Sequence, residues 1–332
     1  MSAAAPAVEL FKPGSKRTGP LSLLCEATYK GTVADRIKRV SELIAAGADV
    51  NGLCYPESSG SQTAFRSAIG SNQPQILKLF LDAGAKMTAK DLEDSIGWFI
   101  PSPKQEISIM LIDAGAPVTR QALRLAVIEG KEKVVKRLLE AGANPNEPDS
   151  FGMTPFSEVI FSFDSYRAEG MERKELVARE QILDMFIAGG ADLVGNIARG
   201  NTNALTLVLE RCPQYLEKIL KGGAVATINT PSGNGLPLVY AATYGKWRDV
   251  RTLLKYGADP HLIPAGALKP DVMRRVIEEA AHIRRRHALA ALGGLPAPSA
   301  VAGAGASAVR TLKAKRSKNA SKTASRRNRK SF

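Results

Sequence analysis

One short stretch near the end of the chain decides the fold: Leu253-Leu254-Lys255-Tyr256-Gly257-Ala258-Asp259-Pro260. Its pattern, apolar residues followed by Gly-Ala, recurs along the 332 residues of the protein. The other copies have their glycines at Gly47, Gly84, Gly115, Gly142, Gly190 and Gly223. Successive copies are 27 to 48 residues apart, around a typical separation of 33. A unit that recurs at this period is typical of a stacked-repeat protein.

Each copy has the pattern of a helix end. Glycine tolerates the left-handed backbone conformation that stops a helix, and an apolar helical turn precedes it. Upstream of each stop, apolar residues follow a helical period over a length that accommodates two short helices. In the last unit we expect these helices at 237–244 and 247–255, with Gly245 between them. Because one such pair cannot bury both of its faces alone, the pairs are expected to stack into a continuous core.

Two segments carry a family resemblance. One is Gly152-Met153-Thr154-Pro155-Phe156-Ser157, and the other is Pro237-Leu238-Val239-Tyr240-Ala241-Ala242-Thr243-Tyr244-Gly245. They resemble the opening Gly-x-Thr-Pro-Leu-His turn and the first helix of ankyrin repeats. The resemblance covers about residues 20–265. It implies an all-α fold, an ankyrin-repeat solenoid of about seven irregular helix-turn-helix repeats.

The units also depart from the family pattern. The family's histidine, which bridges backbone groups in the turn, is replaced here by Ser22, Arg66, Arg124, Ser157 or Val239. We therefore expect other groups to satisfy these turns. Counting back from the helix stops places Thr63 and Thr202 in the family's threonine position.

The pattern divides the chain into four parts. We expect a flexible lead-in at 1–19, the repeat array at 20–265, a capping helix within 266–292 and a disordered basic tail at 293–332. The fifth unit carries a charged insertion at about 162–179. This segment is either an extension of its helices or a protruding loop. It is either a solvated decoration or a contact specific to one partner.

The basic character of the protein belongs to the tail. The formal net charge is +14, yet 13 lysines and arginines and no acidic residue follow Ile283, so the rest of the chain sums to +1. Basic arms bind phosphate by releasing counterions, and such patches also act as nuclear-localisation signals. The candidate tail residues for nucleic acid or targeting are Lys313, Lys315, Arg316, Lys318, Arg326, Arg327, Arg329 and Lys330. Since no aromatic residues are interleaved with them, sequence-specific readout is not expected.

The sequence lacks the motifs of a catalytic or metal site. It has no Gly-rich phosphate loop, no HExxH motif and no paired-cysteine metal motif, and its three histidines lie near the end. We therefore expect no enzymatic activity, no cofactor and no metal. No stretch reaches the 18 apolar residues of a membrane span, and no secretory signal is evident.

Cysteine usage bears on the compartment. Cys25, Cys54 and Cys212 form neither an even framework nor a CxxC pair. This pattern indicates a reducing compartment without disulfides, and hence an intracellular protein of the cytoplasm or nucleus. We expect it to be a monomer that does not bind membranes.

Binding is the function that the resemblance implies. Ankyrin proteins generally hold another protein on a concave surface built from turns and the ends of first helices. The candidate protein-binding residues are Ile128, Glu129, Phe151, Thr243, Tyr244 and Trp247. Large aromatics dominate binding hot spots, so Tyr244 and Trp247 are a candidate anchor. The alternative for Trp247 is that it covers the next helix as part of the core.

We therefore expect a non-catalytic scaffold that binds a protein partner. Two alternatives stay open. One is an adaptor associated with nucleic acid or the nucleus, whose basic tail binds either nucleic acid or an import receptor. The other is a microbial or viral effector directed at host proteins.

Overall fold

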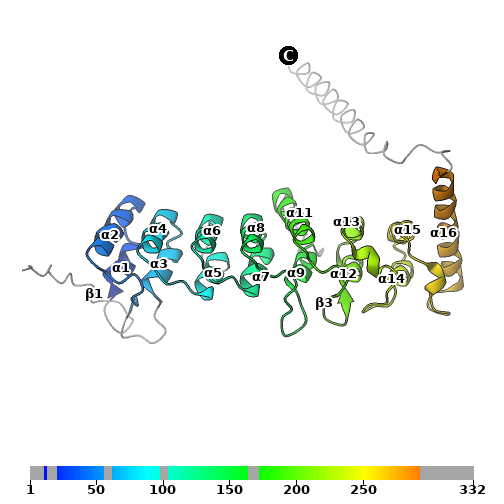
Figure 1. Ribbon diagram of the computed structural model, residues 1–332, viewed down its shortest axis with the longest axis horizontal. Coiled ribbons are helices and arrows are strands. Elements are labelled where there is room, and N and C mark those ends of the chain that lie inside the picture. Colours follow the sequence, from blue (N-terminus) through cyan, green and yellow to red (C-terminus); the bar gives the residue numbers. More distant parts are fainter. Residues whose placement is uncertain (1–10, 13–20, 56–61, 98–103, 164–171, 292–332) are drawn as a thin grey trace, which may run out of the picture. The chain divides into compact units, whose positions relative to one another are not determined.

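The computed structural model describes residues 11–12, 21–55, 62–97, 104–163 and 172–291. Contacts divide the chain into two units, Met1–Lys269 and Pro270–Phe332. In the first unit the described residues form helix pairs that follow one another in chain order (Figure 1). The prediction of an all-α repeat fold is confirmed.

Each pair consists of a first helix and a second helix, which form two rows (Figure 1). The first helices are α1 (Leu23–Ala27), α3 (Ala64–Gly70), α5 (Ala89–Ile96), α7 (Arg120–Ile128), α9 (Pro155–Phe161), α12 (Ala204–Arg211) and α14 (Pro237–Thr243). The second helices are α2 (Val33–Ala45), α4 (Pro74–Asp82), α6 (Gln105–Asp113), α8 (Glu132–Glu140), α11 (Arg173–Ala188), α13 (Leu216–Lys221) and α15 (Trp247–Lys255). Each first helix contacts the first helix of the next pair, so the buried apolar residues form a core that continues between repeats.

Short elements connect the helices. Strand β1 (Phe11–Lys12) pairs antiparallel with β2 (Leu21–Ser22), and β3 (Asn196–Ala198) pairs antiparallel with β4 (Thr202–Asn203). Three 3₁₀ turns are η1 (Pro213–Tyr215), η2 (Ala224–Thr227) and η3 (Pro260–Leu262). The β3–β4 hairpin is the turn that leads into α12.

The glycines end the second helices as predicted. All seven glycines of the Gly-Ala motifs have a positive φ, between 78° and 125°. At the end of α15, the amide of Gly257 donates to the Leu254 carbonyl, and the amide of Ala258 donates to the Leu253 carbonyl. This is the Schellman arrangement, which satisfies carbonyls that the helix itself leaves without a partner.

Polar side chains cap the start of most first helices. The hydroxyl oxygens of Thr63 and Thr154 accept hydrogen bonds from the amides of Arg66 and Ser157, so each threonine caps the helix that follows it. In the sixth repeat the placement at Thr202 is wrong by one residue. The cap of α12 is Asn203, whose side chain accepts from the Thr206 amide, and Thr202 precedes it in strand β4.

Ion pairs between repeats occupy two of the positions where the family has histidine. Arg66 on α3 pairs with Asp94 on α5. Arg124 on α7 pairs with Glu158 on α9 at 2.8 Å. These arginines therefore join neighbouring first helices.

Two lysines cap the first helix of the preceding repeat. Each follows the glycine that separates the helices of its own repeat. Lys131 Nζ donates to the Ile96 carbonyl at the end of α5, and Lys246 Nζ donates to the Leu209 carbonyl near the end of α12, both at 2.5 Å. A cation is favourable at a helix C-terminus, where carbonyls lack partners. Burial lowers the pKa of the Lys131 ammonium.

The insertion of the fifth repeat extends the second helix at its start. Helix α11 has 16 residues, whereas α8 in the preceding repeat has 9. Residues 164–171 of the insertion lie outside the described part of the chain. From α11, the Arg179 guanidinium donates to the Val127 and Ile128 carbonyls at 3.5 and 3.1 Å. The extension therefore supplies the cation that caps α7, in the role that lysine has in two other repeats.

The expectation of a chain without disulfides is wrong. Cys25 on α1 and Cys54 in the following turn form a disulfide, and Cys212 remains a buried free thiol. An odd number of cysteines does not prevent one pair from forming. The turn after α2 folds back on the first repeat, where the Ser22 amide donates to the Cys54 carbonyl, and this return brings the two sulfur atoms together.

The described part of the second unit is helix α16 (Pro270–Ala291). The helix predicted within 266–292 is thus present in the described residues. Its role as a cap of the stack stays a prediction, as do the boundaries of the lead-in and the tail.

Candidate functional site

Helix α14 carries a stripe of half-buried and exposed side chains on one side. Leu236, Val239, Tyr240, Thr243 and Tyr244 are three and four residues apart, so they lie along one side of the helix. The opposite side packs into the core through Leu238, Ala241 and Ala242. We call the first set the α14 face. It offers aromatic and apolar surface that the core does not use.

An aromatic pair occupies the C-terminal end of the α14 face. The rings of Tyr240 and Tyr244 have their centroids 4.7 Å apart. Tyr244 is 67% exposed, while Tyr240 is half-buried. Burial, with a further effect of the nearby Glu210 carboxylate, raises the pKa of the Tyr240 hydroxyl, so this ring stays neutral at physiological pH.

A fixed cation supports this pair. The Lys246 ammonium lies 5.0 Å from the centroid of the Tyr240 ring while it donates to the Leu209 carbonyl. A cation over an aromatic ring is attracted by its electron-rich face. Lys246 therefore holds Tyr240 against the preceding repeat, and Tyr240 in turn supports the exposed Tyr244.

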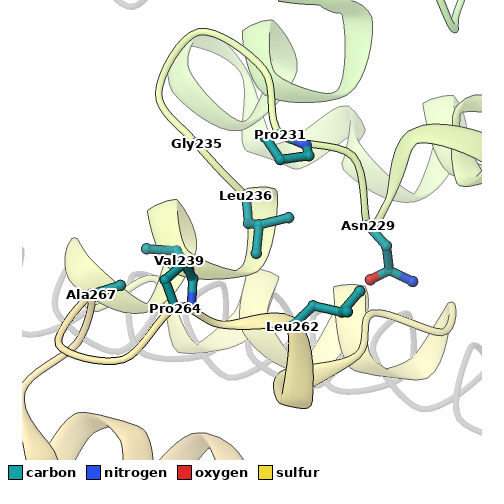
Figure 2. A pocket seen from close by; sticks show the side chains of 8 residues that line it. All are labelled: Asn229, Pro231, Gly235, Leu236, Val239, Leu262, Pro264 and Ala267. Atoms are coloured by element: carbon teal, nitrogen blue, oxygen red, sulfur yellow. The ribbon is translucent and has the colours of Figure 1, made fainter.

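An apolar pocket lies at the other end of the α14 face. It has a volume of about 390 Å³ and is open to solvent. Figure 2 shows the side chains around it, which come from the turn before α14, from α14 itself and from the segment after α15. Its lining is Asn229, Pro231, Gly235, Leu236, Val239, Leu262, Pro264 and Ala267. Since Leu236 and Val239 belong to the α14 face, one short helix joins the pocket to the aromatic pair.

Two hydrogen bonds between the Asn229 side chain and the backbone hold the pocket walls. The Asn229 side chain accepts from the Asp259 amide at 2.9 Å and donates to the Gly257 carbonyl at 3.1 Å. Asn229 thereby ties the turn before α14 to the turn after α15. The pocket is consequently formed by two connected turns of the same repeat region rather than by an unattached loop.

The remaining predicted site residues of the first unit lie in other repeats. Phe151 is 61% exposed in the turn before α9, and the Arg199 guanidinium lies 4.1 Å from the centroid of its ring. Glu129 is exposed after α7, and Ile128 is half-buried with its carbonyl bound by Arg179. Phe151, Ile128 and Glu129 therefore do not belong to the α14 face.

The comparison with known families agrees with the helix-pair geometry. The family described as ankyrin repeats (many copies) matches residues 123–162, which include most of α7 and all of α8 and α9. The chain contains ankyrin repeats.

Solved ankyrin-repeat structures are similar to this chain at low sequence identity. An ankyrin repeat domain from Acinetobacter baumannii AYE is 21% identical; the match covers 60% of this chain and 97% of that domain, with a TM-score of 0.47. The ankyrin repeat domain of Bcl-3 is 18% identical; the match covers 78% of this chain and 98% of that domain, with a TM-score of 0.43.

One curated protein matches part of the chain. Glycerophosphocholine phosphodiesterase gde1 of Schizosaccharomyces pombe (strain 972) is 29% identical over 149 residues, which are 45% of this chain and 10% of that protein. This ankyrin-repeat protein thus spans about a tenth of the length of that relative. The phosphodiesterase activity in that name is the relative's.

The ankyrin array places some of the predicted site residues together and separates others. Thr243 and Tyr244 lie on the α14 face, and Trp247 begins α15 on the other side of the Gly245 turn, where it is half-buried. Sequence reasoning missed Tyr240, Leu236 and Val239, although their spacing from Tyr244 by helical turns was available as a signal.

Three further expectations concern the basic tail, metal binding and membranes. The tail residues Lys313, Lys315, Arg316, Lys318, Arg326, Arg327, Arg329 and Lys330 lie outside the described part of the chain. Within the described ranges, no group of three or more histidine, cysteine or acidic residues could hold a metal ion. Among the same residues, no helix is both long and apolar enough to cross a membrane.

Proposed function

We propose that this ankyrin-repeat protein recruits a protein partner through the α14 face, with Tyr244 as the central anchor. One observation carries the proposal. Tyr244 is exposed, and its ring lies against the ring of Tyr240, which the Lys246 ammonium holds in place. A large ring held in one orientation loses little conformational freedom when a partner covers it. Tyrosines of this kind are enriched among the residues that dominate binding energy.

The pocket adds a second contact of different character. Its apolar lining suits an aliphatic or aromatic side chain of the partner, and its position at the start of α14 lets one partner segment engage both features. The helix rises about 1.5 Å per residue, so the two ends of α14 are roughly 10 Å apart. An extended segment covers that distance with about three residues.

The proposal differs from the sequence-based expectation in its second aromatic residue. Tyr240 takes the supporting position that was expected of Trp247, and Trp247 becomes a flanking residue of the site. Phe151, Ile128 and Glu129 lie in earlier repeats, so they are proposed as contacts only for a partner that extends along the array.

The test measures partner affinity after single substitutions. Partners are captured with the full chain, purified, and titrated against wild type and variants. Tyr244→Ala is expected to weaken binding by about 30-fold, corresponding to a hot-spot loss of about 2 kcal/mol. Val239→Asp, which places a charge in the pocket wall, should weaken it by a similar factor.

The matched control is Tyr29→Ala. Tyr29 is also an exposed tyrosine, 55% accessible, but it lies in the first repeat. It should leave affinity unchanged. If Tyr29→Ala weakens binding as much as Tyr244→Ala, or if Tyr244→Ala has no effect while the circular dichroism spectrum is preserved, the α14 face is not the binding surface.

A further inference from the structure

Charge is distributed unevenly along α16. In its first ten residues, Arg274 and Arg275 are accompanied by Asp271, Glu278 and Glu279. After Glu279 no acidic residue follows as far as the end of the chain. The second part of the helix carries Arg284, Arg285 and Arg286 in succession, and all three side chains are exposed. The helix therefore changes from charge-balanced to purely cationic within its own length.

These three arginines have no carboxylate partner among the described residues. Consecutive helical residues differ by about 100° around the axis, so the guanidinium groups of Arg284 and Arg286 point to nearly opposite sides. The helix thus presents cations on both sides, and no carboxylate of the described residues neutralises them. Such a helix is suited to an anionic ligand that surrounds it.

Duplex DNA has that geometry. Its major groove is about 12 Å wide and admits an α-helix, whose diameter with side chains is similar, between two rows of phosphates. Arginine matches phosphate oxygens with two parallel N–H donors. The major groove of duplex RNA is deep and narrow, which makes it a poor fit for the same helix.

The apolar residues of this part of the helix argue against a membrane surface. Helices that lie in a bilayer interface need bulky apolar side chains such as tryptophan, phenylalanine and leucine opposite their cations. From Ala280 to Ala291 the apolar residues are alanines with single copies of Ile283 and Leu289, and none is aromatic. Such a face gives little insertion energy.

We propose that Arg284, Arg285 and Arg286 form a preformed phosphate-binding cluster by which α16 binds duplex DNA without sequence readout. Ten further lysines and arginines and no acidic residue follow in the sequence. This proposal is independent of the α14 face, which belongs to the first unit.

The test uses the full chain and a mixed-sequence DNA duplex. Affinity is measured by fluorescence anisotropy at several salt concentrations from about 50 to about 200 mM, a range in which affinity that depends on phosphate contacts falls steeply. The variant is Arg284→Gln with Arg285→Gln and Arg286→Gln. Three lost phosphate contacts should reduce the salt slope of log K by about 2.7, and affinity at 0.1 M salt should fall by roughly 100-fold or more.

Two controls separate a built cluster from bulk charge. Lys313→Gln with Lys315→Gln and Arg316→Gln removes the same number of charges and should lower affinity by a smaller factor. Arg274→Gln with Arg275→Gln changes the charge-balanced part of α16 and should have little effect. If the tail triple variant loses as much as the α16 triple variant, the cluster contributes only as part of a general polycation and the proposal is overturned.

A conservative variant guards against unfolding of the helix. Arg284→Lys with Arg285→Lys and Arg286→Lys keeps the charge but removes the paired donors, so it should retain most of the salt slope while binding more weakly. An unchanged slope in the glutamine variant would overturn the proposal. So would a wild-type protein that binds anionic vesicles and not DNA.

Discussion

The left-handed glycine at the end of α15 offers a direct test of the repeat fold. Gly257 has a φ of +99°, and a Cβ built at this position would meet no heavy atom within 4 Å. A substitution here therefore clashes with no neighbour, and its cost comes from the backbone conformation alone. For alanine this cost is about 1–2 kcal/mol. For a β-branched residue the loss should approach about 3 kcal/mol.

Gly70 provides the matched control. It lies in α3 with an ordinary helical conformation, and a Cβ there would also meet nothing within 4 Å. Gly70→Ala should therefore stabilise the protein by about 0.5–1 kcal/mol, because alanine restricts the unfolded chain and favours the helix. The two alanine variants add the same atom in the same amount of space and differ only in the sign of φ.

The assay is urea unfolding followed by circular dichroism, together with amide hydrogen exchange of the last repeat. Because stability in a repeat array is close to a sum of local and interface terms, Gly257→Ala and Gly257→Val should first increase exchange in α15. If Gly257→Ala stabilises the protein as Gly70→Ala does, Gly257 is not a conformationally required helix stop and the account of all the Gly-Ala motifs fails.

Three other predictions concern stability. Cys54→Ser, or reduction of its bond to Cys25, should lower the free energy of unfolding by about 3–4 kcal/mol, because the disulfide closes a loop of 29 residues; urea unfolding with and without reductant measures this. Arg179→Ala should cost about 1–2 kcal/mol through the loss of its bonds to α7, whereas Arg173→Ala, at an exposed position of α11, should cost almost nothing in the same assay. Burial raises the pKa of the Asp249 carboxyl above 3.8. The protonated carboxyl therefore favours the folded state, and the stability that it contributes is lost as pH rises through the raised pKa. Asp249→Asn should remove that loss, and thermal melts from pH 3 to about pH 7 that show no difference between variant and wild type would contradict the assignment.

The sequence was sufficient for features that depend on a few consecutive residues. The helix stops followed from the Gly-Ala motif because a positive φ is a local requirement that glycine meets best. The limits of α15 matched the expected range 247–255 for the same reason, since its amphipathic stripe lies between Gly245 and Gly257. The one-residue error at Thr202 arose where a hairpin, rather than a simple turn, precedes the helix.

Features that depend on contacts between distant residues were harder to predict. The pairing of Cys25 with Cys54 depends on the path of the turn between the first two repeats, which composition does not encode. The pocket beside α14 needs two turns about 30 residues apart to meet, as the Asn229–Asp259 hydrogen bond joins them. The Tyr240–Tyr244 pair was within reach, because an i, i+4 spacing on a helix brings two rings together.

The capping cations explain how repeats that diverge in sequence keep one fold. Each first helix ends with carbonyls that its own hydrogen bonds leave without partners, so a donor is needed at the same place in every repeat. At α5 and α12 a lysine after the inter-helix glycine supplies it, and at α7 the donor is Arg179, which comes from the extended helix of the inserted repeat. The three cations occupy the same position of their repeats, because Lys131, Arg179 and Lys246 each lie eleven residues before the glycine of their own Gly-Ala motif, at 142, 190 and 257. The insertion therefore lengthens the chain before this position and leaves a cation at it, with arginine in place of lysine.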